Sequence, residues 1–424
     1  MTKRNEALSE LGHRTDEPPI AWLMKLALDR PKLISLAAGF TDNPSLPVDA
    51  TRELLEKILG SPKRGQSALQ YGTGAGDAHL RELTAKRIGE QDGGKPRSGA
   101  YAMERLLMTH GSQQFLYMVS EALFDPGDIV LVEDPTYFVY LGIAQSRGMQ
   151  CRGVRMEIDG IDLAHLHLRL EELKKAGDLP RLKALYLVSY HQNPTGTTTS
   201  LAKKQEALEL LRRYESTAGH PIYLLEDAAY RELLFAGEDT PSALTLPGAE
   251  DRVIYSGTYS KPFATGIRVG FGLAPEDLFP AIMRIKGNHD FGTSNLPQQI
   301  LREALASGVY ETHVQALRAR YGIKARAMLG ALRRYCADAA EWVEPRGGLN
   351  VWVKFPHRVA TGLQSKLFAA TLKRDVLYVP GQLCYADDST RRKPNCEMRL
   401  SFGAASESRI REGIKRLGEA ARAT

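Results

Sequence analysis

The sequence predicts an α/β fold: a mainly parallel sheet with helices on both faces, plus a smaller α+β domain. From residue 106 onward, short apolar runs alternate with amphipathic stretches of helical length, the pattern of repeated strand–helix units. The second observation is length, because 424 residues exceed what one simple core usually holds. The hydrophobic fraction of 43% and the charged fraction of 25% are ordinary for a globular protein.

The large domain is expected to begin near residue 51 and to end near residue 296. Its strand-like runs are residues 106–109, 128–133, 184–188, 222–226, 253–256 and 268–273. Its helical stretches include residues 78–90, 112–124, 137–146, 202–216 and 275–285. Ligands bind at the carboxyl ends of the strands in such a sheet, so candidate site residues should follow strands.

The two ends of the chain are expected to form the smaller domain, from residues 1–50 and 297–424. Near the N-terminus, residues 21–28 predict a short helix and residues 33–40 predict a strand. Residues 297–332 are nearly free of proline and predict one long linking helix. The last part predicts strands near residues 342–345, 348–355 and 397–402, and a helix at residues 362–374.

Composition argues against several classes of function. The net charge is +6, without a basic arm or stripe, so we expect no nucleic-acid partner. The N-terminus is polar and no apolar run reaches the length of a membrane span, so we expect no membrane partner and a cytoplasmic location. The cysteines lack metal-ligand spacing, so we expect no metal; they are Cys151, Cys336, Cys384 and Cys396.

The most distinctive pattern surrounds Lys261. Small or hydroxylated residues precede it, among them Thr258 and Ser260, and Arg268 lies seven positions further on. A lysine captures a carbonyl when its neutral amine forms beside an aldehyde, and hydroxyls with an arginine fork suit a phosphate. The pattern therefore suggests an anchor for pyridoxal phosphate, which carries both groups on one ring. The alternative is a surface loop with an ordinary lysine.

Two further candidates follow earlier strands. Ser112 and Gln113 open a helix after the strand at residues 106–109, and such a junction binds anions through free N–H groups and the helix dipole. Ser112 could equally be a plain helix cap. Tyr137 follows the next strand and could lie flat against an aromatic cofactor ring, or be a core tyrosine.

The strands at residues 184–188 and 222–226 are followed by polar residues. Residues 193–196 read Asn-Pro-Thr-Gly, a turn sequence that begins with Asn193. Asp227 ends the second strand, and a buried carboxylate needs a cationic partner. A protonated pyridine nitrogen would be that partner and would make the ring an electron sink. Otherwise Asp227 caps a helix; Tyr230 lies three residues on.

Two candidates lie far from these in the sequence. Arg399 is in a C-terminal strand, and its fork fits a carboxylate, although most such arginines are surface residues. Tyr71 begins a glycine-rich turn before a helix, which could bind phosphate but has no Walker or Rossmann spacing.

In this order, the motifs resemble those of the fold-type I pyridoxal-phosphate-dependent aminotransferases of class I and II. The likeness is greatest to the 2-aminoadipate/kynurenine and aromatic types, and it covers residues 33 to 403. Relatives usually carry an aromatic or apolar residue where this chain has Asn350, a departure that affects the expected substrate pocket.

The resemblance implies a role for each residue. The catalytic residues would be Lys261, Asp227 and Tyr230, and Lys261 would bind the cofactor as a Schiff base. The cofactor would also contact Ser112, Gln113, Tyr137, Asn193, Thr258, Ser260, Arg268 and the neighbouring subunit's Tyr71. The substrate would contact Gly39, Asn193 and Arg399, with Arg399 holding the α-carboxylate.

The resemblance also implies ping-pong transfer of an amino group from an L-amino acid to a 2-oxo acid such as 2-oxoglutarate, in a homodimer with shared sites. Residues 286–295 supply His289 and Phe291 but no arginine for a second carboxylate, so we expect aromatic or 2-aminoadipate-like donors rather than aspartate. Lyases, synthases and oxidases share this fold. A cofactor-binding regulator is a further alternative, but about 30 residues before the first strand are too few for a winged-helix module.

Overall fold

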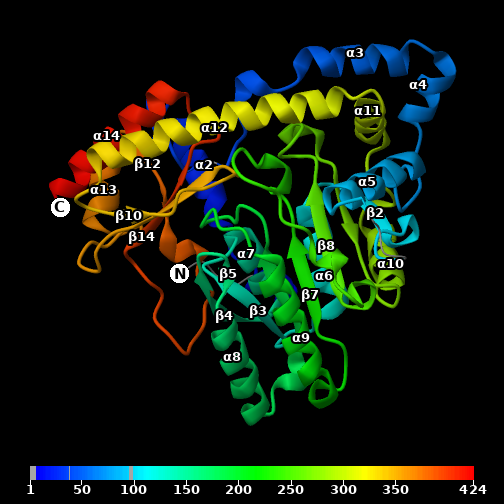
Figure 1. Ribbon diagram of the computed structural model, residues 1–424, viewed down its shortest axis with the longest axis horizontal. Helices are drawn as coiled ribbons and strands as arrows, with labels where there is room; N and C mark the ends of the chain where they lie inside the picture. The colour runs from blue at the N-terminus through cyan, green and yellow to red at the C-terminus, as the bar shows by residue number, and fades with distance from the viewer. Residues whose placement is uncertain (1–5, 38, 95–98) are drawn as a thin grey trace.

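The computed structural model describes residues 6–37, 39–94 and 99–424 (Figure 1). Its centre is a sheet of eight strands in the order β2-β9-β8-β7-β6-β3-β4-β5. These strands are β2 (Leu106–Thr109), β3 (Ile129–Asp134), β4 (Gln150–Glu157), β5 (Gly160–Ile161), β6 (Leu182–Val188), β7 (Tyr223–Asp227), β8 (Val253–Thr258) and β9 (Gly270–Leu273).

The sheet is mixed but largely parallel. Strands β4, β3, β6, β7 and β8 run parallel, whereas β9 is antiparallel to β8 and to β2. The register places Val188 beside Asp227 and Asp227 beside Ser256. The carboxyl ends of three neighbouring strands therefore meet at one edge, and the predicted fold class is confirmed.

Helices cover both faces of this sheet. Consecutive residues of β3 alternate between two hydrophobic clusters, with Val130 and Val132 in one and Ile129 and Leu131 in the other, because side chains alternate along a strand. The first cluster includes α6 (Ser112–Leu123) and α7 (Phe138–Arg147). The second includes α5 (Ala78–Gln91), α8 (Leu163–Ala176) and α9 (Leu201–Ala218).

A smaller sheet lies at the other end of the molecule (Figure 1). Its antiparallel order is β10-β11-β14-β13, with β10 (Glu341–Trp342), β11 (Asn350–Lys354), β13 (Val379–Pro380) and β14 (Glu397–Ser401). Strand β1 (Ile34–Ser35) pairs in parallel with β12 (Val376–Leu377), so segments from both ends of the chain lie together. The helices of this end are α12 (Val309–Tyr335), α13 (Lys366–Lys373) and α14 (Glu407–Arg422).

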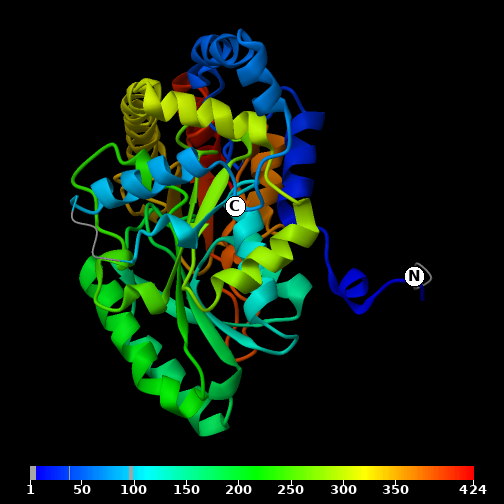
Figure 2. The same ribbon diagram turned by 90° about the vertical axis from the view of Figure 1, so that its right-hand side faces the viewer.

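The remaining helices lie at the margins. They are α1 (Glu10–Arg14), α2 (Pro19–Asp29), α3 (Val48–Leu59), α4 (Pro62–Leu69), α10 (Phe279–Asp290) and α11 (Asn295–Ala306). Figure 2 shows the first described residues running out to one side of the body. None of the helices in the described ranges is long and apolar enough to cross a membrane.

Three sequence expectations need correction. The single helix expected at residues 297–332 is two helices, α11 and α12, separated at Gly308, whose φ of 79° is left-handed and suits glycine. The strand expected at residues 33–40 is limited to Ile34–Ser35, where β12 provides a partner. Arg268 does not belong to a strand, because it has a φ of 51° and β9 begins at Gly270.

Candidate active site

Lys261 lies in the loop that follows β8 at the carboxyl edge of the large sheet. The loop is folded back on itself, because Tyr259 N–H donates to the Val269 carbonyl at 3.0 Å. The Thr258 hydroxyl accepts from Ser260 N–H at 3.1 Å and donates to the Val269 carbonyl at 3.3 Å. Both partners of this hydroxyl are backbone atoms of the loop, so Thr258 shapes the turn that presents Lys261.

The amine of Lys261 has no acidic partner. Its Nζ donates to the Gly39 carbonyl at 2.8 Å, and it forms no ion pair with any residue that the structure describes. Burial, reinforced by Arg399 and Arg268, lowers the pKa of Lys261 to about 8. A lysine in these surroundings loses its proton more easily than an exposed one.

Lys261 lines a cavity of about 230 Å³ together with Asn193, Tyr230 and Arg399. Residues far apart in the sequence are thus brought to one hollow, with Tyr137 and Gly39 on its wall. Much of the remaining wall is apolar and is formed by Ile20, Met24, Phe40, Phe138 and Val139.

Asn193 links Arg399 to Tyr230 across this cavity. Arg399 Nη1 donates to Asn193 Oδ1 at 2.8 Å, and Asn193 Nδ2 donates to the Tyr230 hydroxyl at 3.4 Å. Arg399 also donates to the Ala37 carbonyl, while its buried Nε has no partner among the described residues. The guanidinium is therefore held by neutral oxygens and keeps its charge for a ligand.

Asp227 is the last residue of β7 and is 2% exposed. Its carboxylate accepts from the Tyr186 hydroxyl at 2.9 Å and from Ala229 N–H at 3.0 Å. It makes no ion pair within the described part of the chain, and burial raises its pKa to about 6. A buried carboxylate without a cation is costly, so a cationic ligand would be stabilised beside it.

The opposite end of the site suits an anion. Arg268 Nη1 donates to the Ser260 hydroxyl at 3.1 Å. An added Cβ at Gly111 would lie 2.6 Å from Arg268 Nη2, and one at Gly270 would lie 2.4 Å from Ser112 N. Arg268 therefore reaches the N-terminus of α6, where free N–H groups and the helix dipole attract negative charge.

These groups fit pyridoxal phosphate. Arg268, Ser260 and the N-terminus of α6 match its phosphate, and the unpaired carboxylate of Asp227 matches a protonated ring nitrogen. Lys261 supplies an amine of lowered pKa for the aldehyde. The donors Asn193 and Tyr230 lie within the same cavity.

Some candidates lie elsewhere. Tyr71 is 81% exposed and its ring lies 5.4 Å from that of Phe291, which is also exposed. His289 Nε2 lies 3.1 Å from Glu121 Oε2 in its own chain, near the end of α10. Gln113 is exposed in the first turn of α6. Their roles in cofactor or substrate binding stay predictions.

Several residues near the site have roles that the sequence did not predict. Tyr186, which donates to Asp227, is a phenol in an otherwise mostly aliphatic strand, and that contrast could have identified it. Gln192 donates to Glu133 at 2.8 Å and accepts from the Thr195 hydroxyl at 2.6 Å, which secures the turn that carries Asn193. Burial raises the pKa of Glu133 to about 8.

Asn350, noted above as a departure, lies buried at the start of β11 and its Oδ1 has no partner among the described residues. It pairs with Ser401, two residues from Arg399, so Asn350 and Arg399 share one face of the small sheet.

Comparison with known proteins gives a consistent result. The family model described as aminotransferase class I and II matches residues 31–417. The 2-aminoadipate transaminase of Thermus thermophilus is 32% identical, over 98% of this chain and 96% of its own. The structure of the Pyrococcus horikoshii kynurenine aminotransferase has a TM-score of 0.88 and 30% identity, covering 98% of this chain and 97% of its own. An uncharacterized HTH-type transcriptional regulator of Bacillus subtilis, YisV, is 28% identical over 96% of this chain and 81% of its own length.

Proposed function

This chain belongs to the class I and II aminotransferases, and we propose that it moves an amino group from an aromatic or 2-aminoadipate-like L-amino acid to a 2-oxo acid such as 2-oxoglutarate. The cofactor is pyridoxal phosphate, as in the family. The exchange proceeds in two half-reactions at one site, so donor and acceptor use the same binding groups in turn.

The observation that carries this proposal is the state of Lys261. Its amine is buried at the wall of a cavity, has a pKa lowered to about 8, and faces cations rather than acids. A structural lysine in such a place would be paired with a carboxylate. An amine that readily becomes neutral is suited to capture an aldehyde and to accept a proton.

When bound, the cofactor supplies an aldehyde for the substrate amine and a ring that accepts electron density from the α-carbon. Arg399 binds the substrate α-carboxylate through its fork, oriented by Asn193 and the Ala37 carbonyl. The Lys261 amine would take the proton from the substrate α-carbon and later return it. Asp227 keeps a proton on the ring nitrogen, which increases the electron demand of the ring.

Asn193 and Tyr230 would hold the phenolic oxygen of the cofactor by donating hydrogen bonds to it. The 3.4 Å contact between them shows that their polar atoms converge on one place. Arg268, Ser260 and Ser112 would hold the phosphate, and Tyr137, Gln113 and Thr258 would also contact the cofactor. Gly39 contributes its backbone beside the substrate, because its carbonyl already lies 2.8 Å from the Lys261 amine.

The cavity wall supports the choice of donor. Lys261 and Arg399 are the lysine and arginine that line it, and the residues around them are mostly apolar. Arg399 is committed to the α-carboxylate, so a second carboxylate close to the α-carbon would lack an arginine of this chain. Aromatic side chains and the methylene groups of 2-aminoadipate would instead contact Phe40 and Phe138, which leaves the distal carboxylate of 2-aminoadipate further from Arg399.

We further propose a homodimer with shared sites. An apolar groove of about 650 Å³ lies against the Lys261 loop, between Phe263 and Ile267 on one side and α3 on the other. Val48 and Leu59 of α3 line this groove and are 68% and 45% exposed, and a contiguous exposed apolar patch of this kind marks an interaction site. A second copy would cover the groove and bring its Tyr71 to the phosphate end of this site.

The test is a panel of amino donors added to the protein with bound cofactor, each followed by the change in cofactor absorbance. We expect phenylalanine and 2-aminoadipate to react, and 2-oxoglutarate to reverse the change. Release of ammonia, carbon dioxide or hydrogen peroxide would instead identify a lyase, synthase or oxidase. A protein that binds the cofactor but responds to no donor would favour a regulator-like role.

A further inference from the structure

Two oppositely charged residues follow Tyr230 directly. Arg231 and Glu232 form most of the 3₁₀ turn η4 (Arg231–Leu233), and Tyr230 is the residue at its start. Both charged side chains are largely withdrawn from solvent, at 1% and 13% exposure. The turn that follows Tyr230 is therefore anchored in the protein interior by the side chains of Arg231 and Glu232.

Glu232 is held by the fork of Arg87. Arg87 Nε lies 3.2 and 3.1 Å from the two carboxylate oxygens, and Nη2 lies 2.6 Å from one of them. The Tyr310 hydroxyl donates to the same carboxylate at 3.1 Å, and the Arg87 guanidinium stacks 4.6 Å above the Tyr310 ring. Such a bidentate pair fixes direction as well as distance.

The Arg231 side chain points away from Glu232 and has different partners. Its Nη2 donates to Asp92 at 2.6 Å and its Nε donates to Asp239 at 3.0 Å. The guanidinium also lies 4.9 Å from the centre of the Tyr190 ring. Any rotation or shift of η4 would break contacts on one side or the other.

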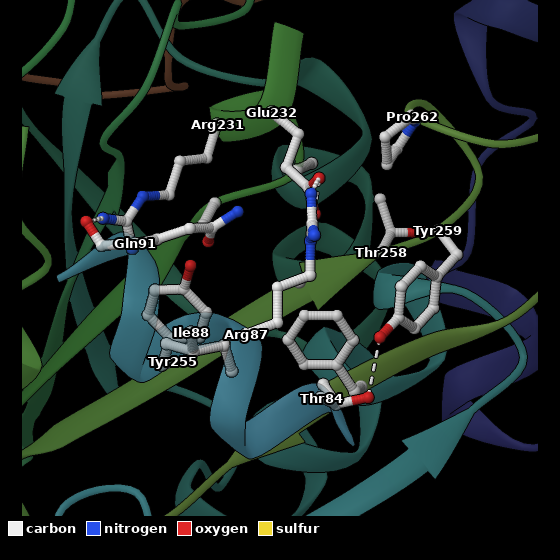
Figure 3. A pocket seen from close by; sticks show the side chains of 14 residues that line it. Thr84, Arg87, Ile88, Gln91, Arg231, Glu232, Tyr255, Thr258, Tyr259 and Pro262 are labelled. Carbon is white, nitrogen blue, oxygen red and sulfur yellow. Dashed lines mark hydrogen bonds and ion pairs between the residues drawn. The ribbon is translucent and has the colours of Figure 1, made fainter. Parts of the chain in front are cut away.

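Both anchors come from one helix. Arg87 lies in the last turns of α5 and Asp92 is its C-cap residue. Figure 3 shows Arg87 between Arg231 and Tyr255 on one side and Thr258, Tyr259 and Pro262 on the other. The same helix contacts the Lys261 loop, because Thr84 Oγ1 lies 2.7 Å from the Tyr259 hydroxyl. One helix thus touches the loops that carry Tyr230 and Lys261.

Stability alone gives little reason for such a pair. Removing two charges from water costs about as much as their attraction returns, and apolar residues of similar volume are often as stable or more so. What an ion pair adds is one defined geometry. We propose that Arg87 and Glu232 are positioning residues that hold the Tyr230 hydroxyl, through η4, at the phenolic oxygen of the cofactor, an inference that rests on the proposed function.

The test replaces the ion pair by an apolar pair, Arg87→Met with Glu232→Met. We expect the melting temperature of the cofactor-free protein to stay close to that of the wild type. The pH midpoint of the absorbance change of bound pyridoxal phosphate should rise by about 1 unit. A misplaced Tyr230 would donate a weaker hydrogen bond to the phenolic oxygen and would therefore stabilise the deprotonated form of the bound cofactor less. We expect kcat to fall about 10-fold or more, with KM less affected.

The chain offers a matched control at the opposite end of the sheet. Arg252, just before β8, forms an ion pair with Glu215 of α9, in which Nε lies 2.7 Å from Oε1 and Nη2 lies 3.1 Å from Oε2. The side chains of this pair are about as exposed as those of Arg87 and Glu232. The variant Arg252→Met with Glu215→Met should leave the absorbance midpoint and kcat at wild-type values, because neither residue contacts a loop of the site.

A folded Arg87→Met/Glu232→Met protein with the wild-type midpoint and kcat would overturn the proposal. If that variant does not fold, Glu232→Gln keeps the shape of the side chain and should shift the midpoint in the same direction by a smaller amount. An unchanged midpoint in Glu232→Gln would also overturn it. Wild-type protein that binds no pyridoxal phosphate would contradict the proposed function instead.

Discussion

Two regions of this molecule carry residues expected at the same cofactor, and they differ in how complete they are. Around Lys261 the polar groups are enclosed, with Asp227 and Arg399 almost wholly buried and each held by neighbours in the chain. Around Tyr71 and Phe291 two large aromatic rings face solvent, with their centroids 5.4 Å apart.

The difference concerns what fixes a side chain in place. In the enclosed region, hydrogen bonds in a medium of low polarity define one geometry. In the exposed region, nothing within the described chain covers the rings, so under the proposed dimer a second copy would have to cover them. Substitutions in the first region should therefore affect the chemistry strongly at any protein concentration. Those in the second should have smaller effects that depend on assembly.

The largest effect is expected for Lys261→Ala. Loss of the amine removes both the covalent attachment and the proton carrier, so kcat should fall by about 10⁴-fold or more. Arg268 and Ser260 remain, so pyridoxal phosphate should still bind, as gel filtration followed by absorbance would show. Lys174→Ala, exposed on α8, is the control. Near-normal amino transfer by Lys261→Ala would refute the assignment.

Asp227→Asn should be next in size. The carboxylate matters most when charge develops on the ring, so kcat should fall by about 10²- to 10³-fold while cofactor affinity changes much less. Equilibrium binding and steady-state rates measured on one preparation separate the two quantities. If the variant keeps almost full activity, Asp227 is only a structural residue at the end of β7.

The pH dependence of pyridoxal phosphate binding tests the enclosed region in a further way. Burial, Arg399 and Arg268 lower the pKa of Lys261 to about 8, and only the neutral amine attacks an aldehyde. In the cofactor-free protein, the rate constant for pyridoxal phosphate binding should therefore rise with pH and level off above about 8. Arg399→Gln removes a nearby cation, which raises the pKa of Lys261, so the midpoint should move to higher pH. Rapid-mixing absorbance measures it; a midpoint that moves down would contradict the argument.

Tyr71→Phe examines the exposed region. If Tyr71 serves the neighbouring subunit's phosphate, removal of its hydroxyl should weaken cofactor affinity about 10-fold and leave the melting temperature of the cofactor-free protein unchanged. Sedimentation at assay concentrations should show a dimer. A fully active monomer would contradict the proposed dimer, because the exposed rings would then have no role at the site.

The smallest effect is expected for Phe291→Ala. This ring stands beside Tyr71 and would reach the neighbouring subunit's pocket, so kcat/KM for phenylalanine should fall several-fold relative to 2-aminoadipate. Specificity constants for phenylalanine, 2-aminoadipate and aspartate give the ranking. An unchanged ranking, or a strong preference for aspartate, would show that Phe291 only contributes to assembly.

Much of the site could be predicted because its signals are local. Asp227 ends β7, and Asn193 and Lys261 follow the ends of β6 and β8 by five and three residues. The carboxyl ends of such strands meet at one edge of a parallel sheet. The break at Gly308 was missed because a glycine within a helical pattern does not by itself end a helix. Strand β4 was missed because its polar residues interrupt the apolar run, as Gln150, Arg152 and Arg155 show.

Other features have no local signal at all. Arg87 and Glu232 are 145 residues apart, and neither differs in the sequence from an ordinary surface charge. Only the packing of α5 against η4 brings them together. The enclosed region is therefore predictable in its ligand-facing residues and unpredictable in the residues behind them, because the former follow strand ends and the latter depend on tertiary contacts.

The hydrogen bond from Lys261 to the Gly39 carbonyl links the chemistry to the N-terminal segment. An amine that has joined an aldehyde keeps at most one N–H, so attachment of the cofactor would weaken the hydrogen bond between Lys261 and the Gly39 carbonyl. The free energy of holding residues 39–45 against the body thus differs between the loaded and the empty protein. Linkage is reciprocal. The factor by which the cofactor changes the ordering of this segment therefore equals the factor by which ordering of the segment changes cofactor affinity. Protease cleavage near Phe40, followed with and without pyridoxal phosphate, would measure that factor directly.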